Sequence, residues 1–396
     1  MLRYGVNYVP PKDWFYSWQD IDLAAVDEDF HAIRELGFDH MRLHLRWDLF
    51  QPNAAFVSKK LLNDLSCMLD KAYKYGLDVQ IAALDGWMSG FWFLPNFIGN
   101  RNIVTDEDVI RAEEYFLAEL ARAVGSHPAL MGIDIGNEIN MFATRLPFTT
   151  EEGDRWLRRI FTLLDELFPG KNNVVGVDHQ PWFSDVQFSR ATLAGTGGMT
   201  SLHTWIGFTG ALGYGIDSEE CLALQAFNIE LADAYATDPG RKVWVQEFGI
   251  TDEWTEPENF ERYIRRSMMA AARCDSLWGF TWWCSHDIDK RLREFQPLEY
   301  GLGLLDGNNR PKPLADYIEK CIEDMKRGEK LPDLKKGAAI VIDESEPFSG
   351  WKYGTAYADL VRQGEHGRFV LSSRADDKAY LSSRGIDRLI RLKSNP

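Results

Sequence analysis

The chain has 396 residues, of which 45% are hydrophobic and 26% are charged, a composition typical of globular proteins. Its 60 acidic residues outnumber its 44 basic residues and give a formal net charge of −16, which argues against binding to nucleic acid or to an anionic membrane surface. Fourteen tryptophans, 14 tyrosines and 23 phenylalanines exceed what core filling normally uses. Flat rings with a polar edge suit sugar faces as well as protein interfaces.

The sequence pattern of residues 2–320 predicts a regular alternation of strands and helices, because short runs of β-branched and aromatic residues alternate with longer segments of helical period. We predict strands at residues 2–8, 39–46, 77–84, 130–136, 173–178, 199–204, 242–248 and 277–283. We predict helices at 23–36, 58–75, 106–124, 151–167, 218–236, 257–273 and 311–326, and a weakly marked one near 183–191. Eight such repeats imply parallel strands with right-handed crossovers that close into a (β/α)8 TIM barrel.

The composition changes after the last of these helices, where RGEKLPDLKKG is charged and contains glycine. We therefore assign residues 1–328 to a catalytic barrel, 329–335 to a linker and 336–396 to a small C-terminal α/β appendage that packs on the barrel. Within the appendage, GAAIVIDES and GRFVLSSRA predict two strands with a helix at 354–363 between them. The appendage is too short to build a large core of its own.

The N-terminal segment and the cysteines favour a reducing, cytoplasmic location. Arg3, Lys12 and Asp13 interrupt any apolar run near the start, and no stretch of 18 apolar residues occurs in the sequence, so neither a signal-peptide core nor a membrane span is predicted. The five cysteines are odd in number, scattered and without a CxxC pair, which predicts neither a disulfide framework nor a zinc site. Phosphate-binding and dinucleotide motifs are absent from the sequence, so no cofactor is expected.

Two of the predicted strands end in glutamate, at the C-terminal end where barrel enzymes hold their catalytic groups. Glu138 follows Gly-Asn at the end of the fourth strand, and Glu247 follows Gln at the end of the seventh. These strands lie across the barrel mouth from each other, so the two carboxylates can face each other over a bound sugar.

Glycoside hydrolysis needs such a pair, one protonated acid for the leaving oxygen and one carboxylate for the anomeric carbon. We predict Glu247 as the nucleophile and Glu138 as the acid/base of a retaining mechanism, which requires carboxyl groups about 5–5.5 Å apart. Arg42, on the second strand, is the predicted partner that keeps Glu247 ionised. Burial near a negative partner is expected to raise the pKa of Glu138.

These motifs resemble family 5 of the glycoside hydrolases, in the clan whose catalytic glutamates close strands four and seven. The resemblance includes Arg42, the Asn137–Glu138 pair, His203 two residues before an aromatic, and Trp283 on strand eight. The chain departs from the family at Trp205, where the family usually has tyrosine, and at Asp-Gly-Trp (85–87), where it usually has a histidine.

Phrases outside these motifs resemble a narrower group, the intracellular subfamily 18 enzymes. The phrases are GVNYVPPKDWFYSW (5–18), FQPN (50–53), GNEINMF (136–142) and TWWCSHD (281–287). The resemblance implies β-mannosidase action on mannosyl-β-1,4-N-acetylglucosamine.

We expect further side chains around the glutamates to bind the substrate. Asn137 is placed to hold a sugar 2-hydroxyl, and His203 to hydrogen-bond the acid/base or a substrate hydroxyl. Trp283 is chosen by resemblance as the floor under the reactive sugar. In the loop that follows, His286 and Asp287 either bind sugar hydroxyls or only cap the turn.

The tryptophans gather after the predicted strands. The loop at 85–105 is longer than most loops of a compact domain, which is typical of functional loops, and its rings favour either a wall that closes one end of the cleft or a hydrophobic cover over helices. Half of all tryptophans are assigned to the proposed sugar site: Trp14, Trp18, Trp47, Trp87, Trp92, Trp205 and Trp283.

The sequence thus predicts a retaining exo-β-mannosidase that acts on small oligosaccharides and needs neither metal nor cofactor. Other activities of the same family stay open, namely endo-β-mannanase, endoglucanase and β-glucosidase. A barrel that binds sugar without cleaving it is the alternative of another class, and a metal-dependent barrel lyase is disfavoured because other strand ends lack clustered ligands. A homo-oligomer stays open.

Overall fold

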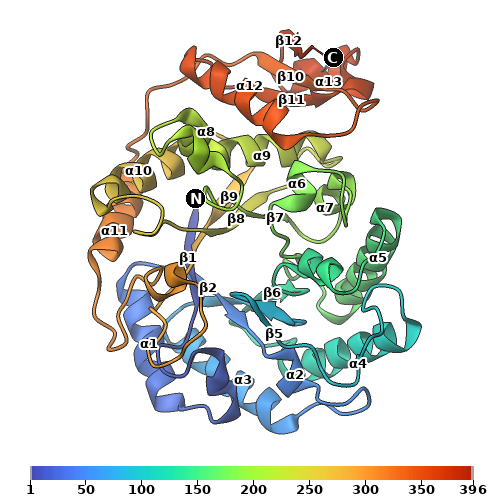
Figure 1. Cartoon of the computed structure of the whole chain (residues 1–396), viewed down its shortest axis with the longest axis vertical. Coiled ribbons are helices and arrows are strands. Elements are labelled where there is room, and N and C mark those ends of the chain that lie inside the picture. Colours follow the sequence, from blue (N-terminus) through green and yellow to red (C-terminus); the bar gives the residue numbers. More distant parts are fainter. Residues whose placement is uncertain (1, 394–396) are drawn as a thin grey trace.

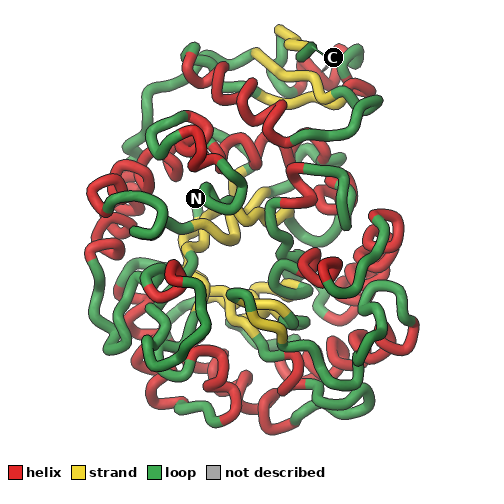
Figure 2. The backbone as a smooth tube through the Cα atoms, in the orientation of Figure 1, coloured by secondary structure: helices red, strands yellow, loops and turns green. Residues whose placement is uncertain are grey.

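The computed structural model describes residues 2–393 and contains the predicted barrel (Figure 1). Its parallel strands form one curved sheet in the order β6-β3-β2-β1-β9-β8-β7. The strands are β1 (Arg3–Tyr8), β2 (His40–His44), β3 (Asp78–Ala82), β6 (Leu130–Asp134), β7 (Thr200–His203), β8 (Val243–Phe248) and β9 (Leu277–Trp282). Figure 2 shows these strands at the centre of a ring of helices, so their carboxyl ends meet at one mouth.

The predicted fifth strand is an extended segment between β6 and β7 and not a regular ladder strand. Val174 exchanges backbone hydrogen bonds of 2.8 and 2.9 Å with Ile133 and Ile135. On the other side, the link to β7 is the Ser201 hydroxyl, which donates to the Val175 carbonyl at 2.6 Å. Together with a backbone hydrogen bond of 2.7 Å from Gly198 to Asn173, this side chain completes the barrel where a backbone ladder was expected.

The barrel helices agree with the predicted ones to within a few residues at most ends. They are α1 (Leu23–Glu35), α3 (Lys59–Lys74), α4 (Glu107–Val124), α5 (Thr150–Leu167), α10 (Phe260–Ala271) and α11 (Pro313–Lys326). The predicted helix at 218–236 is divided into α8 (Glu219–Leu222) and α9 (Leu224–Tyr235), and the weak one into α6 (Gln180–Phe183) and α7 (Arg190–Gly195).

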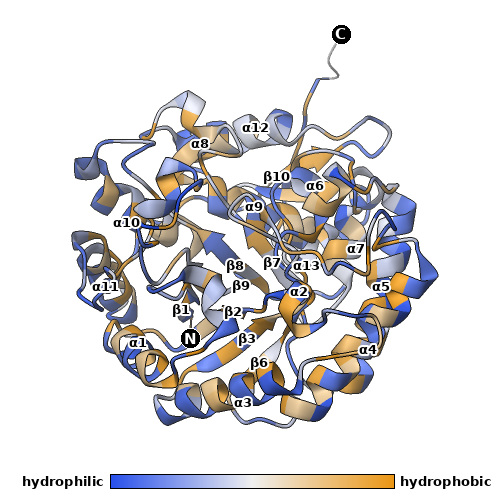
Figure 3. Cartoon of the chain, turned by 60° about the horizontal axis from the view of Figure 1, so that its bottom comes forward, coloured by the Kyte–Doolittle hydropathy of each residue, from blue (hydrophilic) through white to orange (hydrophobic). Residues whose placement is uncertain are grey.

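Sequence signals explain where several of these helices begin. Thr149 and Glu152 form a reciprocal capping box at the start of α5, and the Asp22 carboxylate accepts from the first free N–H groups of α1. In Figure 3, helices such as α3, α4 and α5 combine hydrophobic and hydrophilic residues, the amphipathic pattern by which a helix buries one face against a sheet.

The C-terminal segment forms its own parallel sheet in the order β11-β10-β12. Its elements are β10 (Ala338–Ile342), α12 (Gly350–Arg362), β11 (Arg368–Leu371), α13 (Lys378–Ser383) and β12 (Arg388–Arg391). The sequence did not predict β12. Figure 1 shows this sheet and α12 stacked on the side of the barrel that carries α8 and α9.

Polar and aromatic contacts join the appendage to the barrel. His366 hydrogen-bonds Glu230 of α9 at 2.9 Å, and both side chains are buried. Arg362 of α12 makes two hydrogen bonds of 2.9 Å to Glu220 of α8. Aromatic residues of the appendage belong to the same hydrophobic core cluster as the barrel, so the appendage shares the barrel core.

All five cysteines are free thiols, and four of them are buried. None of the helices in residues 2–393 is both long and apolar enough to cross a membrane.

Candidate active site

The two glutamates meet at the C-terminal mouth of the barrel. Glu138 follows β6 in a left-handed conformation with φ of 43°, and Glu247 lies in β8 where the pairing with β9 shifts register. The Nδ1 atom of His203 lies 3.1 Å from Oε1 of Glu138 and 3.3 Å from Oε2 of Glu247. The facing side-chain atoms of these three residues all lie within 4.8 Å of one another, so both carboxyls can reach one glycosidic bond.

Glu247 is held by two donors. The Arg42 guanidinium donates to Oε1 at 2.5 Å, and the Trp205 indole N–H lies 3.4 Å from Oε2. Burial raises the pKa of Glu247 to about 7, while His203 and Arg42 oppose that rise. The indole N–H of Trp205 therefore donates to the Glu247 carboxylate from the position where the family usually has tyrosine.

Glu138 lies in a more negative environment. Burial and the charge of Asp178 raise the pKa of Glu138 to about 8, against the hydrogen bond from Trp87 and the charge of Arg42. The pKa of Glu138 thus rises further than that of Glu247. The Asp178 carboxylate lies near Glu138, whereas the Arg42 guanidinium is bonded to Glu247. This order suits Glu138 to hold a proton and Glu247 to carry charge.

Gln246 fixes the tautomer of the intervening histidine. Its amide N–H donates to the carboxylate of Asp134 at 2.9 Å, so its Oε1 faces Nε2 of His203 at 3.1 Å and accepts a hydrogen bond from that nitrogen. Burial lowers the pKa of His203, against the charge of Glu247 and the hydrogen bond to Gln246. In the neutral form of the ring, Nδ1 carries a lone pair that can accept a hydrogen bond from protonated Glu138.

A buried network beneath the glutamates holds Arg42. Its guanidinium bonds Asp134 at 2.7 Å, Asn137 at 3.1 Å and Asn7 at 3.2 Å. His44 completes the network through Asn7 at 3.2 Å and Asp85 at 2.8 Å. The sequence analysis missed these supporting residues. Their available signal was a polar residue at or next to the end of an otherwise apolar strand: Asn7, His44, Asp85, Asp134 and Gln246.

Glu138 and Glu247 line a cavity of about 940 Å³. Of the residues assigned from the sequence, Asn137, Trp87, Trp205 and Trp283 line it. Arg42 and His203 touch the two glutamates from the barrel interior. The sequence analysis did not assign the remaining lining residues: Ser89, Gly90, Met141, Asp178, His179, Gln180, Phe208, Gln296, Leu298, Glu299 and Leu302.

Three tryptophans assigned to the sugar site lie in the core instead. Trp14, Trp18 and Trp47 are at most 2% exposed. The Trp18 indole donates to the His44 carbonyl and the Trp47 indole to Gln51. These residues do follow strands at the barrel mouth, but the connecting segments fold their rings beneath the loops, so the assignment was wrong for all three.

Trp92 is half-buried and is not among the residues that line the cavity. The Trp92 ring packs against that of Trp87, with centroids 4.8 Å apart. The guanidinium carbon of Arg145 lies 4.1 Å from the centroid of the Trp92 ring. Trp92 therefore supports the cavity-lining Trp87, and its assignment to direct substrate contact is corrected.

His286 and Asp287 also lie outside the cavity lining. The His286 ring is buried against the Val9 carbonyl at 3.2 Å and the Asn309 side chain at 2.6 Å. Asp287 accepts from Lys312 at 2.6 Å. Of the two roles left open by the sequence, this geometry gives them the turn-capping one, and their assignment to substrate binding is corrected.

The long loop at 85–105 forms a wall at one end of the cavity. It contains an antiparallel hairpin of β4 (Trp87–Met88) and β5 (Phe91–Trp92). Phe91 packs on Phe295 with centroids 4.7 Å apart, and Trp14 contacts Phe295 at 4.8 Å. The rings join this hairpin to the loop after β9, and residues of both segments line the cavity at what we call its closed end.

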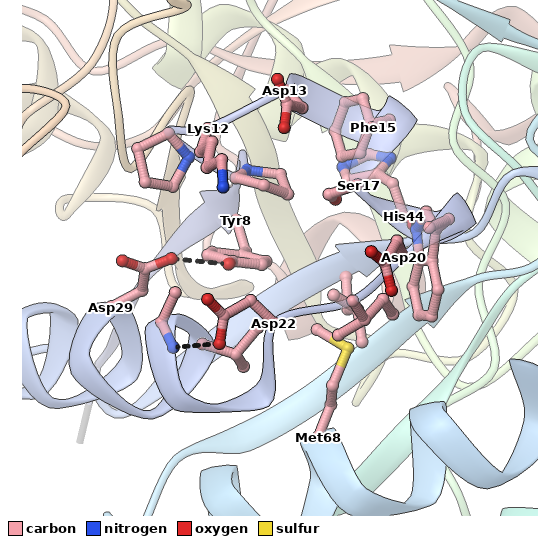
Figure 4. Close-up of a pocket in the computed structure, with 17 residues that line it drawn as sticks. Tyr8, Lys12, Asp13, Phe15, Ser17, Asp20, Asp22, Asp29, His44 and Met68 are labelled. Atoms are coloured by element: carbon pink, nitrogen blue, oxygen red, sulfur yellow. Dashed lines mark hydrogen bonds between the residues drawn. The ribbon is translucent and has the colours of Figure 1, made fainter.

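A second cavity, of about 590 Å³, lies beside β1 and the start of α1 (Figure 4). Its walls include Tyr8, which hydrogen-bonds Asp29 at 2.8 Å, and His44. Neither Glu138 nor Glu247 lines this cavity, so it is separate from the two-carboxylate site.

The comparisons with known proteins agree with this geometry. Residues 11–287 match the family model described as cellulase, glycosyl hydrolase family 5. The chain belongs to glycoside hydrolase family 5. It is therefore a glycoside hydrolase with the (β/α)8 fold of that family.

The solved structures most similar to this hydrolase include subfamily 18 enzymes. One from Streptomyces cattleya, in complex with Manβ1-4GlcNAc, is 33% identical, with 99% of each chain covered and a TM-score of 0.93. One from Bifidobacterium longum subsp. infantis is 31% identical over 99% of this chain and 97% of its own, also with a TM-score of 0.93. An exo-β-1,4-mannosidase from an Opitutaceae bacterium, 21% identical with a TM-score of 0.80, shares the fold. No curated protein matches the chain.

Proposed function

We propose that this hydrolase is a retaining exo-β-mannosidase that acts on small oligosaccharides such as mannosyl-β-1,4-N-acetylglucosamine. The observation that supports this most is the pair of carboxyls, Glu138 and Glu247, within 4.8 Å in a cavity with one end walled by aromatic rings. The sugar assignment is supported by the relatives from Streptomyces cattleya and Bifidobacterium longum, whose complexes hold Manβ1-4GlcNAc.

In the proposed first step, Glu138 donates its proton to the glycosidic oxygen while Glu247 attacks the anomeric carbon. The bond to the leaving sugar breaks and a covalent glycosyl-enzyme forms. In the second step, the ionised Glu138 takes a proton from water, and that water displaces Glu247 from the anomeric carbon. Two inversions at one carbon retain its configuration.

The surrounding residues favour this sequence of steps. Arg42, bonded at 2.5 Å, stabilises the charged form of Glu247 before attack and again when the carboxylate leaves. The Oδ1 of Asn137 accepts a hydrogen bond from Arg42, its amide N–H donates to the Trp87 carbonyl at 3.1 Å, and the residue lines the cavity. We expect Asn137 to bind the sugar 2-hydroxyl. Trp283 offers a ring face for the C–H groups of the reactive sugar.

A side-by-side assay tests the sugar and the mode of attack. We expect p-nitrophenyl β-mannoside to be hydrolysed faster than the β-glucoside and β-galactoside, and the disaccharide to yield free mannose. Preference for the glucoside would overturn the mannosidase assignment. Accumulation of internal oligomers from mannan would overturn the exo assignment and favour an endo-β-mannanase.

Glu247→Ala tests the catalytic role of the nucleophile. We expect kcat to fall by about 10⁴-fold or more, since nucleophile and acid/base act as a unit. Azide should restore turnover and yield a mannosyl azide of inverted configuration. A folded wild-type protein that cleaves none of the aryl glycosides would instead favour a sugar-binding barrel.

We also propose a cytoplasmic location, supported by five free thiols of which four are buried.

A further inference from the structure

A third carboxyl group, that of Glu299, faces the cavity and has no part in the two-glutamate mechanism. It lies in η5 (Pro297–Tyr300), in the loop after β9. Its Oε2 accepts from the Ser89 hydroxyl at 3.1 Å, across 210 residues of sequence. Burial raises the pKa of Glu299 to about 7, against hydrogen bonds from Ser89 and Trp283.

Its neighbours place Glu299 at the donor end of the cavity. Trp283 is the ring proposed to lie under the reactive sugar, and its indole is a hydrogen-bonding partner of Glu299. The charge of Glu138 also acts on the Glu299 carboxyl, so the two carboxyls share one chamber. Asp178 and Phe208 line the same chamber from the loops after β6 and β7, where the leaving sugar would lie.

The wall behind Glu299 is filled by aromatic side chains. Phe295, four residues earlier in the same loop, packs on Phe91 and Trp14 at 4.7 and 4.8 Å. The Tyr300 ring also contacts Phe295, at 5.8 Å, and its hydroxyl donates to the Leu292 carbonyl at 2.8 Å. These rings join the loop of Glu299 to the hairpin of Ser89, and both segments line the cavity.

We propose that Glu299, together with Ser89, binds the hydroxyl groups at the non-reducing end of the terminal sugar and so limits the enzyme to chain ends. This rests on the proposed glycosidase function and deepens it. A carboxylate accepts from two hydroxyls at once, and a serine hydroxyl both donates and accepts. A sugar substituted at such a hydroxyl loses its hydrogen bond to the half-buried carboxylate, which penalises internal units of a chain.

The test is a cycle of enzyme variants against substrate analogues. In wild type, replacing the 3-, 4- or 6-hydroxyl of p-nitrophenyl β-mannoside by hydrogen should lower kcat/KM by about 10- to 100-fold for the hydroxyl that Glu299 binds. In Glu299→Ala that penalty should shrink to about threefold or less, while the penalties for the other hydroxyls persist. Equal penalties in wild type and Glu299→Ala at all three positions would overturn the proposal.

Glu294→Gln is the matched control, because Glu294 lies in the same loop, is exposed and does not line the cavity. It should keep all wild-type penalties. Ser89→Ala should weaken the same hydroxyl penalty less than Glu299→Ala does. If wild type cleaves glucosides and not mannosides, the proposed function fails, but the cycle then runs on deoxyglucosides and still decides the role of Glu299.

Discussion

The two ends of the active-site cavity differ in how deeply their aromatic side chains are buried. At the closed end, the hairpin of β4 and β5 and the loop after β9 are joined by packed rings, and Phe295 is 8% exposed. At the open end, the loops after β6 and β7 contribute Asp178, Gln180 and Phe208, and Phe208 is 48% exposed.

The two ends therefore differ in how firmly their side chains are packed. Buried rings cannot move without opening gaps in the packing, so we expect the closed end to keep one shape and to select the sugar. The open end offers an exposed ring that packs against Trp205 and Trp254 with centroids 5.8 and 5.4 Å away. We expect such a surface to tolerate different leaving groups.

The largest expected effect comes from breaking the closed end. Phe295→Ala removes a buried ring that touches Trp14, Phe91 and Tyr300, so the free energy of unfolding should fall by about 3 kcal/mol. Denaturant unfolding measures this. The opened wall should also admit longer manno-oligosaccharides and raise the share of internal cleavage. A stability equal to wild type would show that the rings do not hold the loops together.

Phe208→Ala is the matched change at the open end and should cost far less. The free energy of unfolding should change by less than about 1 kcal/mol, because the ring is already half exposed. The value of kcat/KM on the disaccharide should fall by about fivefold, through loss of stacking on the leaving sugar. Mannosyl fluoride has no second sugar, so its kcat/KM should stay near the wild-type value; an equal loss on both substrates would place Phe208 at the donor end.

The smallest expected effect is a shift in pH dependence. Hydrolysis needs Glu247 ionised and Glu138 protonated, so kcat/KM should rise as pH passes the pKa of Glu247, about 7, and fall as it passes that of Glu138, about 8. Asp178 at the open end raises the pKa of Glu138. Asp178→Asn should therefore move the alkaline limb to lower pH by up to about one unit.

Glu294→Gln is the comparison for that measurement, since Glu294 is exposed, does not line the cavity and is not among the groups that act on Glu138. It should leave the alkaline limb in place. An alkaline limb that stays in place with Asp178→Asn would show that Asp178 does not set the pKa of Glu138.

The predicted positions agree best with the structure where acidic side chains stand at strand ends. Glu138 and Glu247 come together as predicted, because the ends of parallel strands meet at one mouth, and Arg42 on the second strand reaches Glu247 as predicted. Trp14 and Trp18 were misplaced by the same reasoning, because following a strand brings a residue to the mouth without saying whether its ring points into the cleft or under a loop. Gln246 was not predicted because successive side chains of a strand point to opposite faces, so the neighbour of Glu247 was expected to point away from the site. The register shift in β8 lets both Gln246 and Glu247 face the site.

The sequence by itself determined the barrel, the two glutamates and the family, since these depend on periodicity and on motifs of a few adjacent residues. Only the tertiary structure decided the shape of the cavity. The contact of Ser89 with Glu299 spans 210 residues and joins two loops that have no periodic pattern. Loop residues meet through the packing of rings such as Phe91 and Phe295, and no local signal in either loop specifies its partner.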